Sequence, residues 1–378
     1  MNKKDIASQA LALHKKLRGK VLIAPAMRVR NRLELSLAYT PGVGAVSSFV
    51  AKNRAAAREY TMKGRMVAVI SDGSAVLGLG NIGPLGALPV MEGKCVLFKE
   101  LAGVDAFPIV LQTQNVDEIV DTIINIAPGF GGINLEDFAA PKCFEIEERI
   151  KAALDIPVMH DDQHGTAIVV AAGLMNAAKV VKKSFSKLKV VIVGAGAAGS
   201  AVAKLLLLAG VKDIVVLDRN GIIDAHRPEV HKQALARQTN PRGVTGGMNE
   251  ALLGADAVIG VSGPNLIRAE HIARMASRPI IFALANPVPE IMPDIAKMAG
   301  AAVIATGRSD FSNQINNSLA FPGVFRGALD HRVSKITDAM KLKAAKNLAA
   351  IVKRPTAEKI IPGPFDKNVV PAVARTIK

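Results

Sequence analysis

Short apolar runs alternate with stretches of helical spacing over the first half of the chain. The runs lie at 66–70, 104–111, 132–135 and 156–159, and helix-like stretches occupy 116–126 and 141–154. Apolar runs of this length, without a polar alternation, are typical of strands buried on both faces of a parallel sheet. The pattern therefore predicts an α/β domain.

A second alternation follows a helix-compatible stretch at 166–181. Four to six apolar residues recur at 190–193, 214–217, 257–261, 280–285 and 302–305, each separated by a helical length. This is the signature of a doubly wound parallel sheet. With 378 residues, the chain also exceeds the ~250 at which single cores stop growing. We expect an N-terminal α/β domain over residues 1–164 and a C-terminal Rossmann-type domain, ending in helices, over 165–378.

Charge and composition narrow the function classes. The formal net charge is +16, but the basic residues are scattered and the chain has two Tyr and no Trp. Nucleic-acid binding is disfavoured because few aromatic side chains can stack on bases, whereas small dicarboxylates and dinucleotides would be attracted. No apolar run reaches the ~18 residues of a membrane span. We expect a cytoplasmic protein, with Cys95 and Cys143 as isolated thiols in a reducing compartment.

The N-terminus is basic and could be read as a transit peptide. The helical spacing of Ile6, Ala10, Leu13 and Leu17, together with an acidic residue at Asp5, favours an amphipathic helix instead.

Two segments match the dinucleotide pattern G-x-G-x-x-G, and their contexts differ. The second follows an apolar run and opens an Ala/Leu-rich helix, and Asp218 ends the next apolar run. Its glycines allow pyrophosphate to approach a helix N-terminus, while Asp218 can bind the adenine ribose and favours NAD over NADP. Arg219 could instead cover the 2′-phosphate of NADP, so both cofactors stay open. The predicted cofactor-binding segment comprises Gly194, Ala195, Gly196, Ala197, Ala198 and Gly199.

The first match lacks an acidic residue ending a second strand at the required distance. It is either a packed turn or the backbone-lined floor of an active-site cleft. The predicted floor residues are Val76, Gly78, Gly80, Asn81 and Gly83.

Two acidic pairs, Glu136–Asp137 and Asp161–Asp162, each follow an apolar run. Buried carboxylates at the ends of parallel strands need compensation by cations, by protons or by a divalent ion. An oxygen ligand set of this kind suits Mg²⁺ or Mn²⁺. The alternative is that Asp137 and Asp162 only cap helices.

Candidate proton-transfer groups lie in two turn-rich segments. Tyr39 precedes a Thr-Pro-Gly turn, and Lys94 follows the first glycine motif. Burial and a neighbouring metal would lower the pKa of Lys94 until a neutral amine could accept a proton near pH 7. Tyr39 could otherwise be an interface aromatic and Lys94 a carboxylate partner, while Lys99 is expected at the surface or in an ion pair. His160 and His164 are interpreted as hydrogen-bonding supports.

Seven motifs, in order along residues 35–330, resemble the malic enzyme family in its short bacterial form. They are Ser-Leu-Ala-Tyr-Thr-Pro-Gly, Val-Leu-Gly-Leu-Gly-Asn-Ile-Gly, Glu-Gly-Lys, Gly-Gly-Ile-Asn-Leu-Glu-Asp, His-Asp-Asp-Gln-His-Gly-Thr, Ala-Asn-Pro-Val-Pro-Glu and Gln-Ile-Asn-Asn-Ser-Leu-Ala-Phe-Pro-Gly. The resemblance implies oxidative decarboxylation of L-malate to pyruvate and CO₂ with NAD or NADP and Mg²⁺ or Mn²⁺. It also implies a homodimer or a dimer of dimers.

The resemblance also implies roles for single residues. Lys94 matches the family's general base, Tyr39 its general acid and Asp161 a carboxylate of the catalytic network. The implied metal ligands are Glu136, Asp137 and Asp162. The substrate and nicotinamide are expected to contact Tyr39, Lys94, Asn286, Asn316 and Asn317.

One departure leaves a gap in this assignment. Longer family members have a substrate-binding arginine a few residues before their equivalent of Gly78, whereas residues 71–76 here contain none. The group that binds the distal carboxylate of malate is therefore open. Other readings are a metal-dependent dehydrogenase of another 2-hydroxyacid such as tartrate, a catalytically silent NAD-binding protein, and an amino-acid dehydrogenase, which would need no metal.

Overall fold

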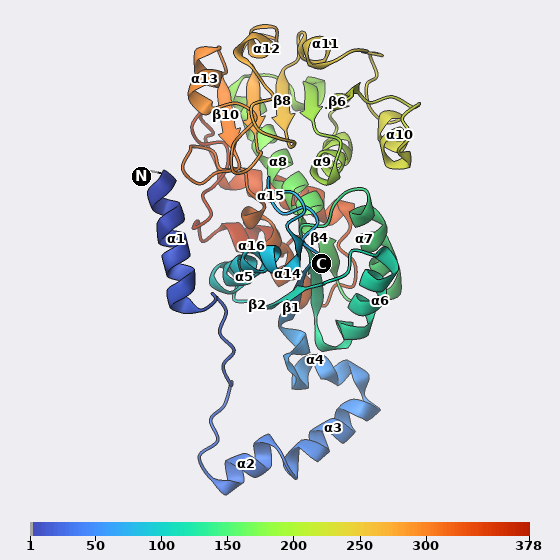
Figure 1. The fold of residues 1–378 in the computed structure, drawn as a ribbon, viewed down its shortest axis with the longest axis vertical. Coiled ribbons are helices and arrows are strands. Elements are labelled where there is room, and N and C mark those ends of the chain that lie inside the picture. The colour runs from blue at the N-terminus through green and yellow to red at the C-terminus, as the bar shows by residue number, and fades with distance from the viewer. Residues whose placement is uncertain (1–2) are drawn as a thin grey trace.

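The computed structural model describes residues 3–378 and contains two sheets flanked by helices, with α8 (Asp161–Val180) running between them (Figure 1). The first sheet is parallel throughout, in the order β2-β1-β3-β4. Its strands are β1 (Met66–Ser71), β2 (Asp105–Val110), β3 (Gly132–Leu135) and β4 (Val158–His160). These are the four strands predicted from the apolar runs, with ends shifted by one or two residues.

Helices cover both faces of this sheet because its buried side chains alternate. Val67 and Val69 of β1 belong to the core beneath α5 (Gly83–Ala102), whereas Ala68 and Ile70 belong to the core that includes residues of α6 (Val116–Ile126) and α7 (Lys142–Ala153). The helical spacing in the sequence located α6 and α7 closely.

The second sheet has the order β10-β9-β8-β5-β6-β7, in which only β7 is antiparallel. The strand order reverses between β5 and β8, which is the switch point of a doubly wound fold. The strands are β5 (Lys189–Val193), β6 (Asp213–Asp218), β7 (Gly221–Ile222), β8 (Ala257–Gly260), β9 (Ile280–Ala283) and β10 (Val303–Thr306). The predicted Rossmann-type domain is confirmed, although the short β7 was not predicted.

Helices flank this sheet on both sides. The α9 helix (Ala197–Leu208) packs against α8 and β6. The other helices are α10 (Val230–Ala236), α11 (Met248–Leu252), α12 (Ala269–Ala273) and α13 (Pro293–Met298). Short 3-10 helices lie at Arg54–Ala56, Met62–Gly64, Ala127–Gly129, Phe185–Lys187 and Asn317–Leu319.

The C-terminal helices return to the first sheet. Phe321 and Phe325 of α14 (Phe321–Asp330) stack edge-on against Phe98 of α5. The α15 helix (Asp338–Ile351) packs on α8, and α16 (Val369–Ala374) packs on α14 and α15. The boundary expected at residues 164/165 falls inside α8, which is one continuous helix.

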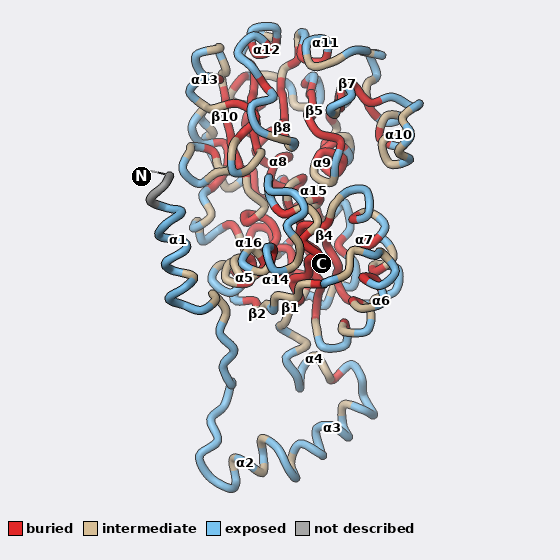
Figure 2. The backbone as a smooth tube through the Cα atoms, in the orientation of Figure 1, coloured by how far each residue is buried: buried red, intermediate tan, exposed pale blue. Residues whose placement is uncertain are grey.

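The N-terminal segment contains α1 (Lys3–Leu17), α2 (Arg32–Ala38), α3 (Gly42–Lys52) and α4 (Ala57–Tyr60). The predicted amphipathic helix is present as α1, although Leu13 and Leu17 are exposed. Residues 21–60, here called the N-terminal arm, lead away from both sheets, and the tube along them is mostly in the colour of exposed residues (Figure 2). Over residues 3–378, none of the helices combines the length and hydropathy that a bilayer crossing requires.

Candidate active site

A cavity of about 760 Å³ lies where the carboxyl ends of β3, β4, β8 and β9 approach the N-terminus of α9. Carboxyl ends of parallel strands are the usual place for ligands in open α/β sheets. The cavity is lined by residues from both domains and from α1, among them Lys20, Lys94, Glu136, Asp137, Asp162, Ala197, Asn286 and Asn317.

Three carboxylates meet in this cavity. Glu136 and Asp137 directly follow β3, and Asp162 lies in the first turn of α8, directly after β4. One ligand atom from each lies within 4.8 Å of those of the others, and Asp162 Oδ2 also accepts a hydrogen bond of 2.8 Å from the backbone N–H of Asp137. Asp137 has a φ of 56°, a left-handed conformation that is uncommon for a residue other than glycine and concentrates at functional sites.

Burial disfavours the ionised form of these carboxylates when no positive charge compensates them. It raises the pKa of Asp137 to about 8, with a further contribution from the Asp162 charge, and it raises the pKa of Glu136 as well. Asp137 Oδ2 is buried without a hydrogen-bond partner among the described residues. An unpartnered buried oxygen in a set of three carboxylates fits a divalent cation that prefers oxygen ligands.

Lys94 lies beside the acidic cluster, on α5. Its side chain is buried, and its ammonium forms ion pairs with Glu136 and with Asp161, at 2.5 Å from Asp161 Oδ2. It also lies 4.5 Å from the centre of the Phe321 ring. Glycine at 165 makes room for this arrangement, since a Cβ there would collide with Asp161 Oδ1.

Without a metal ion, the pKa of Lys94 is raised, so the expected lowering by burial and a neighbouring metal together stays a prediction. Burial does lower the pKa, but the charges of Asp161, Glu136 and Asp162 outweigh it and raise the pKa above its ordinary value. The same burial raises the pKa of Asp161 to about 6 against the opposing effect of Lys94. Lys94 is therefore an ammonium until the negative charge around it is compensated.

The second glycine motif forms the other wall of the cavity. Gly196 precedes α9, and Gly196, Ala197 and Ala198 line the cavity. A Cβ on Gly199 would collide with the carbonyl oxygen of Gly194, so only glycine lets the strand-to-helix turn close this tightly. This is the cradle that a pyrophosphate at a helix N-terminus requires.

Asp218 ends β6 as predicted, but it already has cationic partners. Its carboxylate lies 2.8 Å from Lys232 Nζ and 3.2 Å from Arg227 Nη2, and it accepts a hydrogen bond from the backbone N–H of Asn220. These contacts offset the effect of burial and lower the pKa of Asp218. Arg219, the cation considered from the sequence, is exposed.

The predicted asparagines and one predicted floor residue are brought together. Asn286, Asn316 and Asn317 all line the cavity. Gly78 lines it too, and a Cβ there would collide with the carbonyl oxygen of Asn286, so glycine lets the two loops touch. The other predicted floor residues, Val76, Gly80, Asn81 and Gly83, lie nearby in the chain but are not among those lining the cavity.

Tyr39 is not brought into the cavity of its own chain. It ends α2 in the N-terminal arm, 68% exposed, and it is not among the lining residues. The carbonyl of Tyr39 accepts a hydrogen bond of 2.7 Å from the backbone N–H of Val43, in the turn that leads into α3. Of all the predicted catalytic residues, Tyr39 alone lies on an element that does not reach the site.

Two contributors were not predicted. Lys20 lines the cavity from the segment that follows α1, and its ammonium donates to the carbonyl of Pro89 in α5 at 2.7 Å. Glu290 is fully buried and accepts hydrogen bonds of 3.0 Å from the backbone N–H groups of Ser262 and Ala285, which line the cavity. Glu290 ends the sixth motif, directly after Pro289, but only the fold shows which backbone groups it binds.

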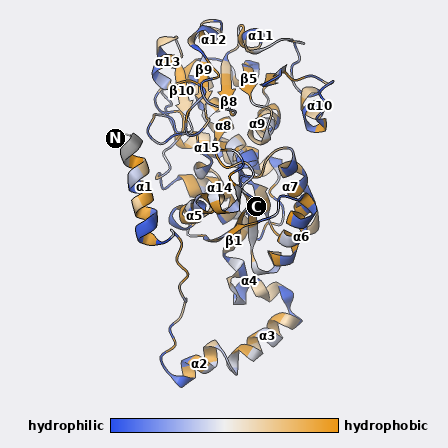
Figure 3. Ribbon diagram, in the orientation of Figure 1, coloured by the Kyte–Doolittle hydropathy of each residue, from blue (hydrophilic) through white to orange (hydrophobic). Residues whose placement is uncertain are grey.

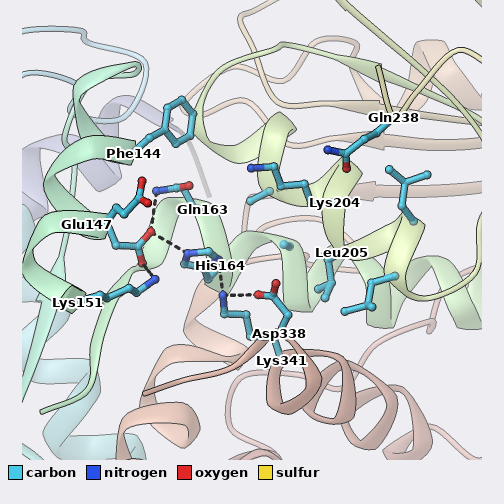
Figure 4. Close-up of a pocket in the computed structure, with 15 residues that line it drawn as sticks. Phe144, Glu147, Lys151, Gln163, His164, Lys204, Leu205, Gln238, Asp338 and Lys341 are labelled. Carbon is cyan, nitrogen blue, oxygen red and sulfur yellow. Dashed lines mark hydrogen bonds and ion pairs between the residues drawn. The ribbon is translucent and has the colours of Figure 1, made fainter. Parts of the chain in front are cut away.

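A second cavity, of about 710 Å³, lies on the other side of the α8 N-terminus (Figure 4). Glu147 of α7 accepts hydrogen bonds there from Gln163 Nε2, at 3.2 Å, and His164 Nε2, at 2.9 Å. His164 Nδ1 faces Lys341 Nζ of α15 at 3.0 Å, and Lys341 donates in turn to Asp338. The interpretation of His164 as a hydrogen-bonding support is confirmed.

His160 plays that part only through its backbone, which donates to Glu147 at 2.9 Å. Its ring nitrogens have no hydrogen-bond partner among the described residues, although Nε2 lies 3.4 Å from Asp162 Oδ2. Burial lowers the pKa of His160.

Comparison with known proteins identifies the family. The family model for the N-terminal domain of malic enzyme matches residues 18–151, and that for the malic enzyme NAD binding domain matches residues 163–374. A bifunctional malic/malolactic enzyme of Bacillus subtilis (strain 168) is 53% identical over 378 residues, which are 99% of this chain and 92% of that protein. An NAD-dependent malic enzyme of Geobacillus stearothermophilus is 50% identical over 99% of this chain and 78% of that protein.

The fold agrees with a solved structure of similar sequence. The crystal structure of an NAD-dependent malic enzyme from Thermotoga maritima superposes with a TM-score of 0.94 at 48% identity, covering 98% of each chain. Relatives named as NADP-dependent malic enzymes are also similar, so the relatives differ in cofactor. The sequence motifs, the cavity and these comparisons agree, and the chain belongs to the malic enzyme family.

Proposed function

We propose that this protein converts malate to pyruvate and CO₂ with reduction of NAD or NADP, as its membership of the malic enzyme family implies. The observation that carries this proposal is one cavity lined by three carboxylates, a buried lysine and the dinucleotide glycine motif. A metal-dependent tartrate dehydrogenase would need the same groups, but family membership favours malate.

The proposed metal site consists of Glu136, Asp137 and Asp162. Their carboxylates fit Mg²⁺ or Mn²⁺ because the ligand atoms lie within 4.8 Å of one another and Asp137 Oδ2 has no other described partner. A divalent ion bound here would supply Lewis-acid polarisation of the C2 oxygen of malate. With such an ion bound, the three carboxylates could stay buried in their ionised form.

We assign Lys94 as the general base that takes the proton from the C2 hydroxyl. It can do so only as a neutral amine, and compensation of the Glu136 and Asp162 charges removes two of the interactions that hold its pKa high. Asp161, hydrogen-bonded to Lys94 Nζ, orients the amine and is the next group that can share the proton. Tyr39 is assigned as the acid that protonates C3 after decarboxylation.

For the distal carboxylate of malate we propose Lys20. It lies on the wall of the same cavity, and an added Cβ on Gly93 would lie 3.2 Å from its ammonium, which places the ammonium beside the residue that precedes Lys94 on α5. The arginine that longer family members carry before the first glycine motif is missing here, and Lys20 supplies a cation from a different element. The K20M variant should raise the KM for malate with a smaller effect on kcat, because it removes binding that is common to the ground and transition states.

For the cofactor we propose NAD as the preferred partner, with NADP tolerated. Asp218 can accept hydrogen bonds from the ribose hydroxyls, which favours NAD. Arg227 and Lys232 already neutralise its charge, so repulsion of a 2′-phosphate is weaker than from an isolated carboxylate. The variant D218S should shift the ratio of the two kcat/KM values toward NADP. A native preference for NADP would contradict this assignment.

The test of the function as a whole is the appearance of NADH or NADPH and of pyruvate from a panel of 2-hydroxyacids, with and without Mn²⁺. Malate should give pyruvate and reduced cofactor in equal amounts, only when the divalent ion is present. Turnover of tartrate in preference to malate, or full activity in excess EDTA, would contradict the proposal.

A further inference from the structure

Glu290 is a buried acid that the proposed chemistry does not use. It lies beside the ends of β8 and β9, two strands that are apolar and buried along their whole length (Figure 3). Burial raises the pKa of Glu290, whereas hydrogen bonds from the backbone N–H groups of Ser262 and Ala285 favour its ionised form. No lysine, arginine or histidine of residues 3–378 lies within ion-pair distance of it. A buried carboxylate in this position lacks a cation that would compensate its charge.

The two hydrogen-bond donors come from loops that form one wall of the active-site cavity. Ser262 follows β8 and Ala285 follows β9, and both line the cavity together with Asn286. Glu290 is not among the lining residues, so the peptide groups of Ser262 and Ala285 lie between its carboxylate and the cavity. A Cβ on Gly260, the last residue of β8, would lie 2.4 Å from the carboxyl carbon of Glu290. Glycine there lets one carboxylate join the ends of two neighbouring strands.

The order of the strands places the nicotinamide half of the cofactor against this wall. In the second sheet, β8 and β9 lie on one side of β5, and β6 lies on the other side. The pyrophosphate belongs at the N-terminus of α9, which follows β5, and the adenine ribose belongs at Asp218, which ends β6. The other end of the dinucleotide therefore extends over the ends of β8 and β9. This step rests on the proposed function of the protein as an NAD- or NADP-dependent enzyme.

We infer that Glu290 is a positioning residue for the nicotinamide and that its charge favours binding of the oxidised cofactor over the reduced cofactor. The nicotinamide ring carries a positive charge in NAD⁺ and NADP⁺ and no charge in NADH and NADPH. Water screens the attraction between this ring and a buried carboxylate only weakly. The oxidised ring is thus the cation that Glu290 lacks within its own chain. Hydride transfer neutralises the ring, so this attraction ends when the product forms, and release of the reduced cofactor is favoured.

The test compares the dissociation constants of the oxidised and the reduced cofactor in Glu290→Gln. Isothermal titration calorimetry measures them on the whole chain with Mn²⁺ and without malate, so that no turnover occurs. Relative to the unaltered chain, the ratio of the Kd for NADH to the Kd for NAD⁺ should fall by on the order of ten-fold. Loops that are only loosened would bind both forms more weakly and would leave the ratio unchanged. An unchanged ratio in Glu290→Gln would therefore overturn the inference.

Two further variants separate the charge from the shape of the side chain. Glu290→Asp keeps the charge on a shorter side chain, so both forms should bind more weakly while the ratio stays close to that of the unaltered chain. Asp294→Asn is the matched control, because it removes an exposed charge from the nearby α13 helix and should leave both constants unchanged. A fall of the ratio in Asp294→Asn or in Glu290→Asp as large as that in Glu290→Gln would contradict the assignment to the buried charge.

A second measurement needs no variant and so does not depend on whether Glu290→Gln folds. Its probe is benzamide adenine dinucleotide, in which carbon replaces the charged ring nitrogen of NAD⁺ and the ring is neutral. The unaltered chain should bind this analogue more weakly than NAD⁺, by on the order of ten-fold. Equal or tighter binding of the neutral analogue would overturn the inference. In a folded Glu290→Gln protein, the difference between the two compounds should largely disappear.

Failure of the inference and failure of the proposed function give different results. An unaltered chain that binds neither NAD⁺ nor NADP⁺ would overturn both, because it would lack the proposed cofactor. Where NADP⁺ is bound more tightly than NAD⁺, the same ratio is measured with NADP⁺ and NADPH. A chain that binds the cofactor and oxidises malate, but whose ratio does not respond to Glu290→Gln, would overturn the inference and leave the proposed function intact.

Discussion

The first turn of α8 divides two cavities, and the buried charges on its two sides differ in how completely they are paired. Toward the active site, Asp137 and Asp161 each have a buried oxygen without a hydrogen-bond partner among the described residues. Toward the second cavity, Glu147 has hydrogen bonds from Gln163 and His164 and an ion pair with Lys151. The active-site side, called the unpaired side, needs a ligand to compensate its charges. The side with Glu147, called the paired side, holds α8 in place.

The pKa values separate the same two sides. Burial raises the pKa of Asp137 to about 8, whereas the pKa of Glu147 lies well below its ordinary value because contacts with His164 and Lys151 outweigh burial. Asp137 and Glu147 are both buried, but their pKa values shift in opposite directions, because the charged groups around each carboxylate decide the sign of the shift. Substitutions on the unpaired side should change catalysis and metal binding, and those on the paired side should change stability.

The largest expected effect is on the unpaired side. Lys94→Ala removes the proposed base and should lower kcat for malate oxidation by ~10²-fold or more. Lys99→Ala is the matched control, because Lys99 lies on the same helix and its exposed side chain pairs with Asp105. Rates of NADH formation at saturating Mn²⁺ compare the two. A Lys94→Ala protein with nearly normal kcat would exclude Lys94 as the base.

The sequence predicted the strands and the residues that follow them because both depend on local pattern. The apolar runs located β1 and β3, and parallel pairing then fixed Glu136 and Asp162 at one edge. Asp161 and Lys94 were chosen from motifs, and the fold brought them to within hydrogen-bonding distance. The strands and the residues that follow them depend on local sequence, and these features were predicted well.

The features that could not be predicted from the sequence depend on long-range contacts. The pKa of Lys94 depends on carboxylates from two other segments, and their combined charge could not be estimated from residue spacing. Lys20 reaches its position through contacts with Glu92 and Pro89 of α5, and Glu147 through contacts between α7 and the start of α8, so no local pattern marked them. Tyr39 was assigned by its motif, but its distance from the cavity depends on the path of the arm.

The second prediction concerns metal binding on the unpaired side. Asp137→Asn keeps an oxygen ligand but removes a charge, so the Mn²⁺ concentration for half-maximal activity should rise by at least about ten-fold. Asp121→Asn, an exposed substitution on α6, is the control. Unchanged Mn²⁺ dependence in Asp137→Asn would exclude Asp137 as a ligand.

The same substitution should alter the pH dependence of stability in metal-free protein. The pKa of Asp137 is raised, so the folded chain holds a proton that the unfolded chain releases between about pH 4 and pH 8. The contribution of Asp137 to the free energy of unfolding therefore falls as the pH rises through this interval. Urea titrations should show a weaker fall with rising pH in Asp137→Asn. A slope equal to that of the unaltered chain would mean that Asp137 is not a buried, uncompensated acid.

The third prediction concerns the paired side. Glu147→Gln removes the charge that Lys151 and the ring of His164 contact and should lower the free energy of unfolding by about 3 kcal/mol. The control is Glu148→Gln, which changes an exposed neighbour on the same helix. The Mn²⁺ requirement of the folded enzyme should change little. If Glu147→Gln raised the Mn²⁺ requirement as much as Asp137→Asn does, the two sides of α8 would not be separable.

The smallest expected effect is that of His164→Gln. Burial lowers the pKa of His164 to about 4, and its neutral ring can donate from Nε2 to Glu147 while Nδ1 accepts from Lys341. The unfolded chain binds a proton at this residue below about pH 6.5 that the folded chain does not bind until about pH 4. The contribution of His164 to stability is therefore complete above about pH 6.5 and is lost as the pH falls toward about 4. The contribution of Asp137 changes with pH in the opposite direction.

Gln can make both hydrogen bonds without titrating. On acidification, His164→Gln should therefore lose less free energy of unfolding than the unaltered chain, by on the order of 1 kcal/mol. The exposed control His226→Gln should behave like the unaltered chain. Urea unfolding at neutral and mildly acidic pH measures the difference. An unchanged pH dependence in His164→Gln would show that folding does not shift the pKa of this ring.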